Sequence, residues 1–180
     1  MDLTEKKVSS AEVFSGNLLH VFRDEIALPN GKPAVREYIR HVGAACVVPM
    51  NEKGEVYMVR QFRYPFGRPL LEVPAGKLDT KEEDPAHAAL RELSEETGIE
   101  AAELTYLGEF YPTCAYSDEV IHIYLAKGLT FAETHPDDDE FVETAVYPLK
   151  TLVDMVMRGE IEDGKTQVAL LKTAIALRYI

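Results

Sequence analysis

The chain has 180 residues, of which 46% are hydrophobic and 28% are charged, proportions that are ordinary for a soluble globular protein. Its formal net charge is -12, from 31 acidic and 19 basic residues. This excess of acid argues against general binding to nucleic acid or to anionic membranes, because both require basic surfaces. An anionic substrate would therefore need local arginines or a bound metal ion.

Cysteine usage and hydropathy predict a protein of the cytoplasm. The two cysteines, Cys46 and Cys114, are too few for a disulfide framework, and Cys46 stands in an apolar run that suits a core residue. The N-terminal stretch contains no continuous apolar segment of the kind that a signal peptide carries. No apolar run approaches the roughly 18 residues of a membrane-spanning helix, so we expect no membrane span.

Residues 11–41 are expected to form extended strands. A strand-like run at 18–28 is followed by Pro-Asn-Gly-Lys at 29–32, which is typical of a hairpin turn, and an extended pattern then resumes. This hairpin has few large apolar residues of its own, so it must pack on something else. We therefore treat residues 1–41 as an N-terminal β-strand subdomain and residues 42–180 as the main domain.

The main domain alternates predicted strands with predicted helices. A helix is expected at 84–97, with Asp84 as its N-cap, Pro85 in its first turn and Gly98 as its C-terminal stop. Several strand pairs are joined by tight turns, which favours a mixed sheet flanked by helices over a purely parallel sheet. The expected strands are 43–50, 55–64, 69–77, 102–111, 120–129 and 141–149, and the further helices are 148–158 and 165–178.

Residues 76–100 are crowded with carboxylates, and three of them share one face of the expected helix. At 100° per residue, Glu92, Glu95 and Glu96 lie within about 100° of arc, while the apolar side chains lie on another face. Like charges four residues apart destabilise a helix by roughly 0.2–0.5 kcal/mol. A Mg²⁺ or Mn²⁺ ion, which prefers oxygen ligands, would offset that repulsion. The alternative is a solvated face on which Arg91 pairs with Glu95.

This helix and the loop before it resemble the Nudix box, a family pattern of glycine, glutamate, Arg-Glu, an aliphatic residue, any residue, Glu-Glu, any residue, glycine and an aliphatic residue at fixed spacing. Residues 91–99 (RELSEETGI) match its second half in full, and Gly76 matches its first glycine. The first half carries one extra residue. We assign its glutamate to Glu83 rather than Glu82, because seven residues then separate it from Arg91. In the family this glutamate pairs with the arginine.

The resemblance extends over most of the chain and is to the ADP-ribose pyrophosphatase branch of the Nudix hydrolases. It implies an α/β/α sandwich with a mixed sheet, and an N-terminal β-strand subdomain that packs against a partner subunit in a homodimer. The implied reaction is hydrolysis of the pyrophosphate of ADP-ribose, or of other ADP-sugars, to AMP and a sugar phosphate such as ribose 5-phosphate. The resemblance is carried by VREYIRHVGAACVVP, VYMVRQFRYP, LLEVPAGKLD and DGKT.

Four metal ligands are implied by the same resemblance. They are the backbone carbonyl of Ala75 and the carboxylates of Glu92, Glu95 and Glu96, and we also expect Glu95 and Glu96 to act in catalysis. Divalent ions bridge phosphate oxygens, neutralise developing charge and activate a water. Two or three Mg²⁺ or Mn²⁺ ions per site would thus reconcile an acidic protein with a pyrophosphate substrate.

The resemblance implies that the general base lies outside the box, in a later loop that matches the acidic segment 135–143. We choose Glu140 as this base and as a further metal ligand, with Asp138 and Asp139 as competitors. A flexible loop could bring such a carboxylate within hydrogen-bond reach of a metal-bound water when substrate binds. The alternative is a solvated turn that contains four acids.

Three arginines are candidates for binding the substrate. Arg63 matches a phosphate-contacting arginine of the branch, Arg60 is a second candidate, and Arg36 is expected to approach the adenine end from the N-terminal subdomain. Each of them could instead be an ordinary arginine on a strand surface.

The loop beyond the box departs from the branch. Where the branch often carries Pro-Gly, this chain has Cys114 and Ala115. We therefore expect the loop 112–119 to be loose and to discriminate poorly among ADP-sugars. Glu119, at its end, is a further candidate for substrate contact.

Three functions remain open at this point. The first is hydrolysis of ADP-ribose or a similar ADP-sugar. The second is hydrolysis of another nucleotide derivative by the same chemistry, such as a GDP-sugar, a dinucleotide or a nucleoside triphosphate. The third is a non-catalytic module that senses a nucleotide, which the intact Glu92, Glu95 and Glu96 argue against.

Overall fold

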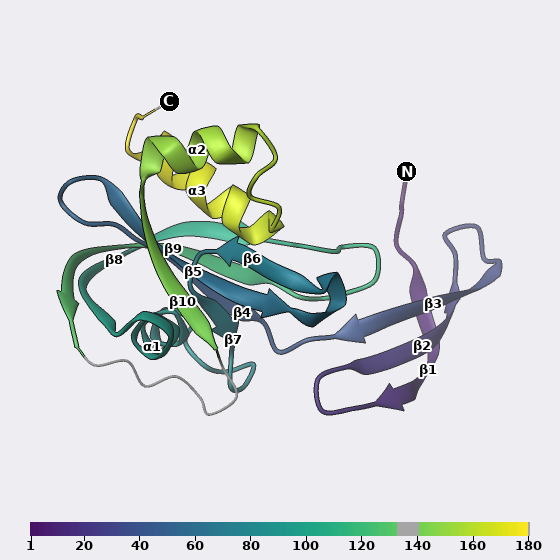
Figure 1. Cartoon of the computed structure of the whole chain (residues 1–180). Coiled ribbons are helices and arrows are strands. Elements are labelled where there is room, and N and C mark those ends of the chain that lie inside the picture. The colour runs from purple at the N-terminus through teal and green to yellow at the C-terminus, as the bar shows by residue number, and fades with distance from the viewer. Residues whose placement is uncertain (133–140, 180) are drawn as a thin grey trace. The chain divides into compact units, whose positions relative to one another are not determined.

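The computed structural model describes residues 1–132 and 141–179 (Figure 1). The chain forms two compact units. The first consists of Met1–Val42 together with Thr113–Glu119, and the second consists of Gly43–Pro112 together with Val120–Ile180. Each helix in the described ranges is too short or too polar to span a membrane.

The first unit is built on an antiparallel sheet with the order β1-β2-β3. The predicted turn between its second and third strands is confirmed: the N–H of Gly31 donates to the carbonyl of Leu28 at 2.8 Å. Gly31 has a φ of 80°, which glycine adopts without steric cost. The first strand begins earlier than predicted, and all of its residues are exposed. The strands are β1 (Lys6–Ser15), β2 (His20–Ala27) and β3 (Pro33–Arg40).

The second unit contains a mixed sheet and a smaller antiparallel sheet. The mixed sheet has the order β7-β4-β9-β8, in which β4 and β9 run parallel. Its strands are β4 (Ala44–Pro49), β7 (Ala75–Lys77), β8 (Ile99–Phe110) and β9 (Ile121–Phe131). The smaller sheet, with the order β10-β5-β6, contains β5 (Glu55–Arg63), β6 (Arg68–Glu72) and β10 (Val142–Pro148), and the 3₁₀ helix η1 (Tyr64–Phe66) joins β5 to β6.

Helices cover both faces of the mixed sheet (Figure 1). Successive side chains of β4 point to opposite faces, and all of them are buried. Cys46 and Val48 pack with α2 (Leu149–Met157) and α3 (Gly164–Ala176), whereas Ala45 and Val47 pack with α1 (Pro85–Thr97). The predicted α/β/α sandwich with a mixed sheet is therefore confirmed. Burial raises the pKa of Cys46 to about 12, which suits the predicted core residue.

The helix that carries the acidic residues begins and ends where the sequence predicts. The side chain of Asp84 accepts a hydrogen bond from the N–H of Ala86 at 2.9 Å, as an N-cap does. Gly98 follows α1 with a φ of 65°, and its N–H donates to the carbonyl of Ser94. Leu93 is among the side chains that α1 buries against the sheet.

The strand predicted at 69–77 is wrong, because the chain is broken there into two strands. β6 ends at Glu72 in the small sheet, and β7 begins at Ala75 in the mixed sheet. Pro74 lies in the break, where it cannot donate to a sheet ladder. Its carbonyl accepts a hydrogen bond from the N–H of Val47 at 3.0 Å. The break therefore carries the chain from one sheet to the other just before the box.

Candidate active site

Glu96 lies against the backbone of β7, the short strand that leads into the box. It is only 6% exposed, and its Oε2 accepts a hydrogen bond from the N–H of Ala75 at 3.1 Å. A buried carboxylate requires hydrogen bonds or positive charge to offset its lost hydration. The fold thus brings one acid of the helix into contact with the residue whose carbonyl is the expected backbone ligand.

Gly76 makes room for a second carboxylate. A Cβ added to Gly76 would lie 2.0 Å from Oε1 of Glu92 and 2.4 Å from its Oε2. These separations are far inside van der Waals contact, so a larger residue would displace the carboxylate. The first glycine of the box is therefore explained by the close approach of Glu92 to the backbone.

Arg91 contacts three acids of the box. Its Nη1 lies 2.9 Å from Oε1 of Glu92 and 3.6 Å from Oε2 of Glu95, and its Nη2 lies 3.4 Å from Oε1 of Glu83. Burial by itself would lower the pKa of Arg91, but the surrounding carboxylates raise it. The ion pair of Arg91 with Glu95, which a solvated helix face would contain, is thus present, but its distance of 3.6 Å is long. The contact with Glu83 agrees with the choice of Glu83 over Glu82.

The donor set suits a hard divalent cation. Glu92, Glu95 and Glu96 offer carboxylate oxygens, which Mg²⁺ and Mn²⁺ prefer, and the glycine at 76 lets one of them approach the backbone. Within residues 1–132 and 141–179, no three acidic, histidine or cysteine side chains already converge as a cation site. Arg91 contacts Glu92 and Glu95, so a cation would compete with this arginine for them.

A buried ion pair holds Arg63, the expected phosphate-binding arginine. Its Nε donates to Oε1 of Glu72 at 2.6 Å and its Nη2 donates to Oε2 at 2.7 Å. Lys165 also donates to Oε2 of Glu72, which is only 2% exposed. Burial by itself would raise the pKa of Glu72, but the hydrogen bonds from Arg63 and the charge of Lys165 bring it below its ordinary value. Arg63 is therefore partly exposed to solvent, while the edge of its guanidinium made by Nε and Nη2 is bound to Glu72.

No role for Glu72 or Lys165 could be predicted from the sequence. The signal for Glu72 was a single carboxylate inside the apolar run Pro-Leu-Leu-Glu-Val-Pro. A charge in such a run is buried when the strand is buried, and a buried charge needs a partner. The partner could not be predicted from spacing, because Lys165 lies 93 residues further along the chain.

Comparison with known proteins identifies the family. A model of the NUDIX domain matches residues 39–168. The chain belongs to the NUDIX family. It is 40% identical over 170 residues to "ADP-ribose pyrophosphatase" of Bacillus subtilis (strain 168), which covers 93% of this chain and 91% of the relative. It is 39% identical over 168 residues to "Methanol dehydrogenase activator" of Bacillus methanolicus, which covers 92% of this chain and 90% of that relative.

A solved structure agrees with the fold of this Nudix hydrolase. The crystal structure of "ADP compounds hydrolase" covers 99% of this chain and 97% of that chain with a TM-score of 0.89, at 22% sequence identity. At this identity the likeness concerns the fold. The family match and the relatives in sequence confirm the prediction of a hydrolase similar to ADP-ribose pyrophosphatases.

The Nudix hydrolase does not place Arg60 beside Arg63. They are three positions apart along β5, and side chains at an odd spacing on a strand leave it on opposite faces. Arg60 lines a small pocket with Arg68, Glu160 and Glu162, in which Arg68 and Glu162 form an ion pair at 2.5 Å. Arg60 therefore faces a different surface from Arg63 and is the weaker of the two candidates.

Arg36 belongs to the first unit and is engaged there. Its Nε donates to Oε2 of Glu5 at 2.9 Å, its Nη2 donates to Oε1 of Glu5, and its Nη1 donates to the carbonyl of Val35 at 3.0 Å. A substrate that used Arg36 would have to replace Glu5. Its role at the adenine end stays a prediction.

The loop predicted to be loose is instead held to β3. The N–H of Ile39 donates to the carbonyl of Tyr116 at 2.8 Å, and the N–H of Asp118 donates back to the carbonyl of Ile39 at 3.2 Å. Oδ1 of Asp118 also accepts a hydrogen bond from the N–H of His41 at 2.7 Å. Glu119 follows, 3.8 Å from Nδ1 of His41. Backbone pairing thus provides the rigidity that a Pro-Gly pair would have provided locally.

The expected general base falls outside the described residues. Glu140 and its competitors Asp138 and Asp139 lie within 133–140, which the description does not include. The assignment of Glu140 therefore stays a prediction.

Proposed function

We propose that this Nudix hydrolase cleaves the pyrophosphate of ADP-ribose to AMP and ribose 5-phosphate, with Mg²⁺ or Mn²⁺ as the cofactor. The observation that carries the proposal is the approach of Glu92 to Gly76 beside the contact of Glu96 with Ala75. This arrangement gathers acids around the backbone of β7, and it serves an anionic substrate only through cations. A cytoplasmic location stays a prediction from the sequence.

The residues of the box would hold the cations. Glu92, Glu95 and Glu96, with the carbonyl of Ala75, are the proposed ligands of two or three ions. Bound ions supply charge neutralisation on the phosphate oxygens and acidify the attacking water. Glu140 is proposed to accept the proton from that water and to add a further ligand.

Arginine would complete the charge balance on the substrate. The guanidinium carries five N–H groups, of which Glu72 takes two from Arg63. Its Nη1 edge is the proposed donor to a phosphate oxygen, since planar guanidinium groups suit phosphate geometry. Arg36, Arg60 and Glu119 stand as further proposed contacts of the nucleotide or the sugar.

ADP-ribose is expected to be the best substrate of a panel that also contains ADP-glucose, GDP-mannose and a dinucleotide. Because the loop 113–119 is held to β3, we expect ADP-glucose to be cleaved about tenfold less efficiently, a difference of about 1.4 kcal/mol. The measurement is kcat/KM with Mg²⁺ and with Mn²⁺, with products separated by chromatography.

The same panel separates the alternatives. If GDP-mannose is preferred over both ADP-sugars by tenfold or more, the proposed adenosine specificity is wrong and another nucleoside diphosphate derivative is the substrate. Binding without turnover on every compound, with either metal, would favour a nucleotide-sensing module.

We also propose that the protein is a homodimer in which the first unit takes part. All of β1 is exposed, including Val8 at 69% and Phe14 at 56%, and a three-stranded sheet needs a covered apolar face. Light scattering at micromolar concentration should give the mass of two chains. The substitution Phe14→Asp should lower the measured mass. Phe66→Asp is the matched control, because Phe66 is 67% exposed on the second unit. A fully active monomer would contradict the proposal.

A further inference from the structure

The segment Asp163–Thr166, which lies outside the box, forms hydrogen bonds with the end of β6 and with the residue that follows it. Oδ2 of Asp163 accepts hydrogen bonds from the N–H and the Oγ1 of Thr166, at 2.9 Å and 2.6 Å. The Oγ1 of Thr166, in turn, accepts a hydrogen bond from the N–H of Val73 at 3.0 Å. Lys165 donates both to Oδ2 of Asp163 at 3.0 Å and to Glu72. The start of α3 is thereby tied to the strand end that holds Arg63.

Charges balance within this cluster. Glu72 and Asp163 supply two negative charges, and Arg63 and Lys165 supply two positive charges. The side chains of Glu72 and Lys165 are only 2% and 12% exposed, so water screens this part of the cluster poorly. Without Lys165, Arg63 would be the one cation left to compensate the buried Glu72 among the contacts that the described chain shows.

The two edges of the Arg63 guanidinium connect the charge balance of the cluster with substrate binding. One edge of the guanidinium, made by Nε and Nη2, is bound by Glu72. Across residues 1–132 and 141–179, no hydrogen bond from its Nη1 is found. The side chain is 38% exposed, so a ligand can reach it. A phosphate bound there would lie next to a carboxylate, whose repulsion Lys165 offsets.

We propose that Lys165 is a positioning residue for the anionic part of the substrate, acting by sharing Glu72 with Arg63. It rests on the function proposed above. Lys165 neutralises Glu72 through its hydrogen bond to Oε2, so that the charge of Arg63 remains available to a pyrophosphate. It also keeps the Nε edge of Arg63 on Glu72 and the Nη1 edge toward solvent.

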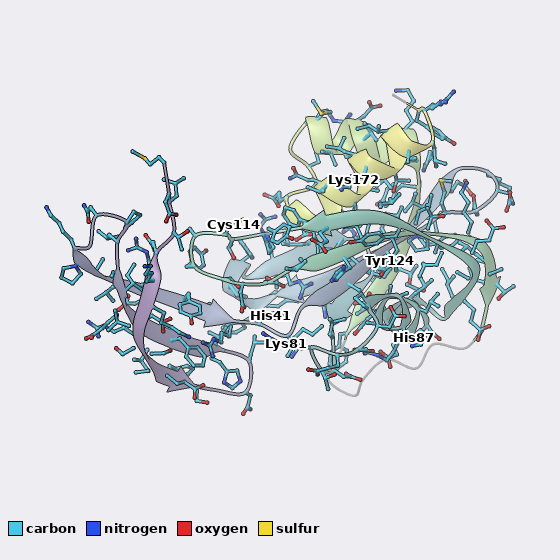
Figure 2. The ribbon with its side chains drawn as sticks, turned by 180° about the vertical axis from the view of Figure 1, so that it is seen from behind. His41, Lys81, His87, Cys114, Tyr124 and Lys172 are labelled. Carbon is cyan, nitrogen blue, oxygen red and sulfur yellow. The ribbon has the colours of Figure 1, made fainter. Side chains whose placement is uncertain are left out.

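The test compares Lys165→Met with Lys165→Arg and with Lys172→Met. Lys172 is a matched control on the same helix α3 (Figure 2), where its Nζ donates to the carbonyl of Leu107 at 2.9 Å. Binding of ADP-ribose is measured by calorimetry in EDTA, where no divalent ion contributes, and KM and kcat are measured with Mg²⁺. Thermal unfolding is recorded for each variant.

Lys165→Met is expected to weaken binding in EDTA about tenfold and to raise KM by a similar factor, while kcat stays within about threefold of wild type. Lys165→Arg should recover most of the affinity. Lys172→Met should leave binding and KM within about threefold of wild type, even if its unfolding temperature falls. The double variant Lys165→Met with Glu72→Gln should bind better than Lys165→Met alone, because the uncompensated carboxylate is gone.

Four results would overturn the inference. Unchanged binding by Lys165→Met would leave Lys165 a structural residue and would leave the proposed function intact. An equal loss in Lys172→Met would assign the effect to general helix packing. If the wild-type protein neither binds nor cleaves ADP-ribose, the proposed function fails and this inference fails with it. Should Lys165→Met not fold, the double variant decides: binding tenfold or more below wild type would contradict the charge argument.

Discussion

Glu96→Gln is expected to abolish nearly all turnover while leaving the fold intact. A glutamine keeps a carbonyl oxygen that can accept the hydrogen bond from the N–H of Ala75, so the local packing survives. It loses the negative charge that a proposed ligand of the cations needs. Removing one ligand should cost several kcal/mol of transition-state stabilisation, or at least about 100-fold in kcat. The measurements are kcat at saturating Mg²⁺ and Mn²⁺, and the affinity for Mn²⁺ by calorimetry.

Glu100→Gln is the control for this variant. Glu100 is an exposed glutamate on β8, just beyond the box, so the same loss of one charge should leave kcat unchanged. Circular dichroism and thermal unfolding should be alike for the two variants and the wild type. If Glu96→Gln keeps turnover within about tenfold of wild type, Glu96 is not a metal ligand.

Gly76→Ala is expected to be nearly as damaging, although it removes no functional group. The added Cβ would lie 2.0 Å from Oε1 of Glu92, so the carboxylate must move away from the backbone. The displaced acid would then leave the proposed cation site. We expect at least a 100-fold loss of kcat, or about 2.7 kcal/mol, together with weaker binding of Mn²⁺ in the absence of substrate.

Gly159→Ala separates this clash from the ordinary cost of replacing a glycine. Gly159 has a φ of 73°, and a Cβ there would meet no atom within 4 Å. Alanine should cost about 1–2 kcal/mol of stability through the left-handed backbone and leave kcat unchanged. If Gly76→Ala keeps kcat within threefold of wild type, Glu92 can move without loss of activity. The close approach of Glu92 to Gly76 would then not be needed for catalysis.

The sequence by itself determined the features that depend on neighbours along the chain. The N-cap at Asp84, the stop at Gly98 and the shared face of Glu92, Glu95 and Glu96 follow from the 3.6-residue period and from capping chemistry. β4 was predicted as a buried strand because all of its residues are apolar. The choice of Glu83 followed from its seven-residue gap to Arg91, most of which lies in the helix α1.

Only the tertiary structure decided the features that join distant segments. Pro74 was read as part of one strand, yet the two halves belong to different sheets, and sheet membership depends on which strands pair. The loop 113–119 lacks Pro-Gly, but β3 supplies its rigidity through hydrogen bonds across the fold. Glu72 and Lys165 meet from 93 residues apart. Such contacts form because a buried charge and an unpaired backbone group must find a partner, and topology alone determines which partner is within reach.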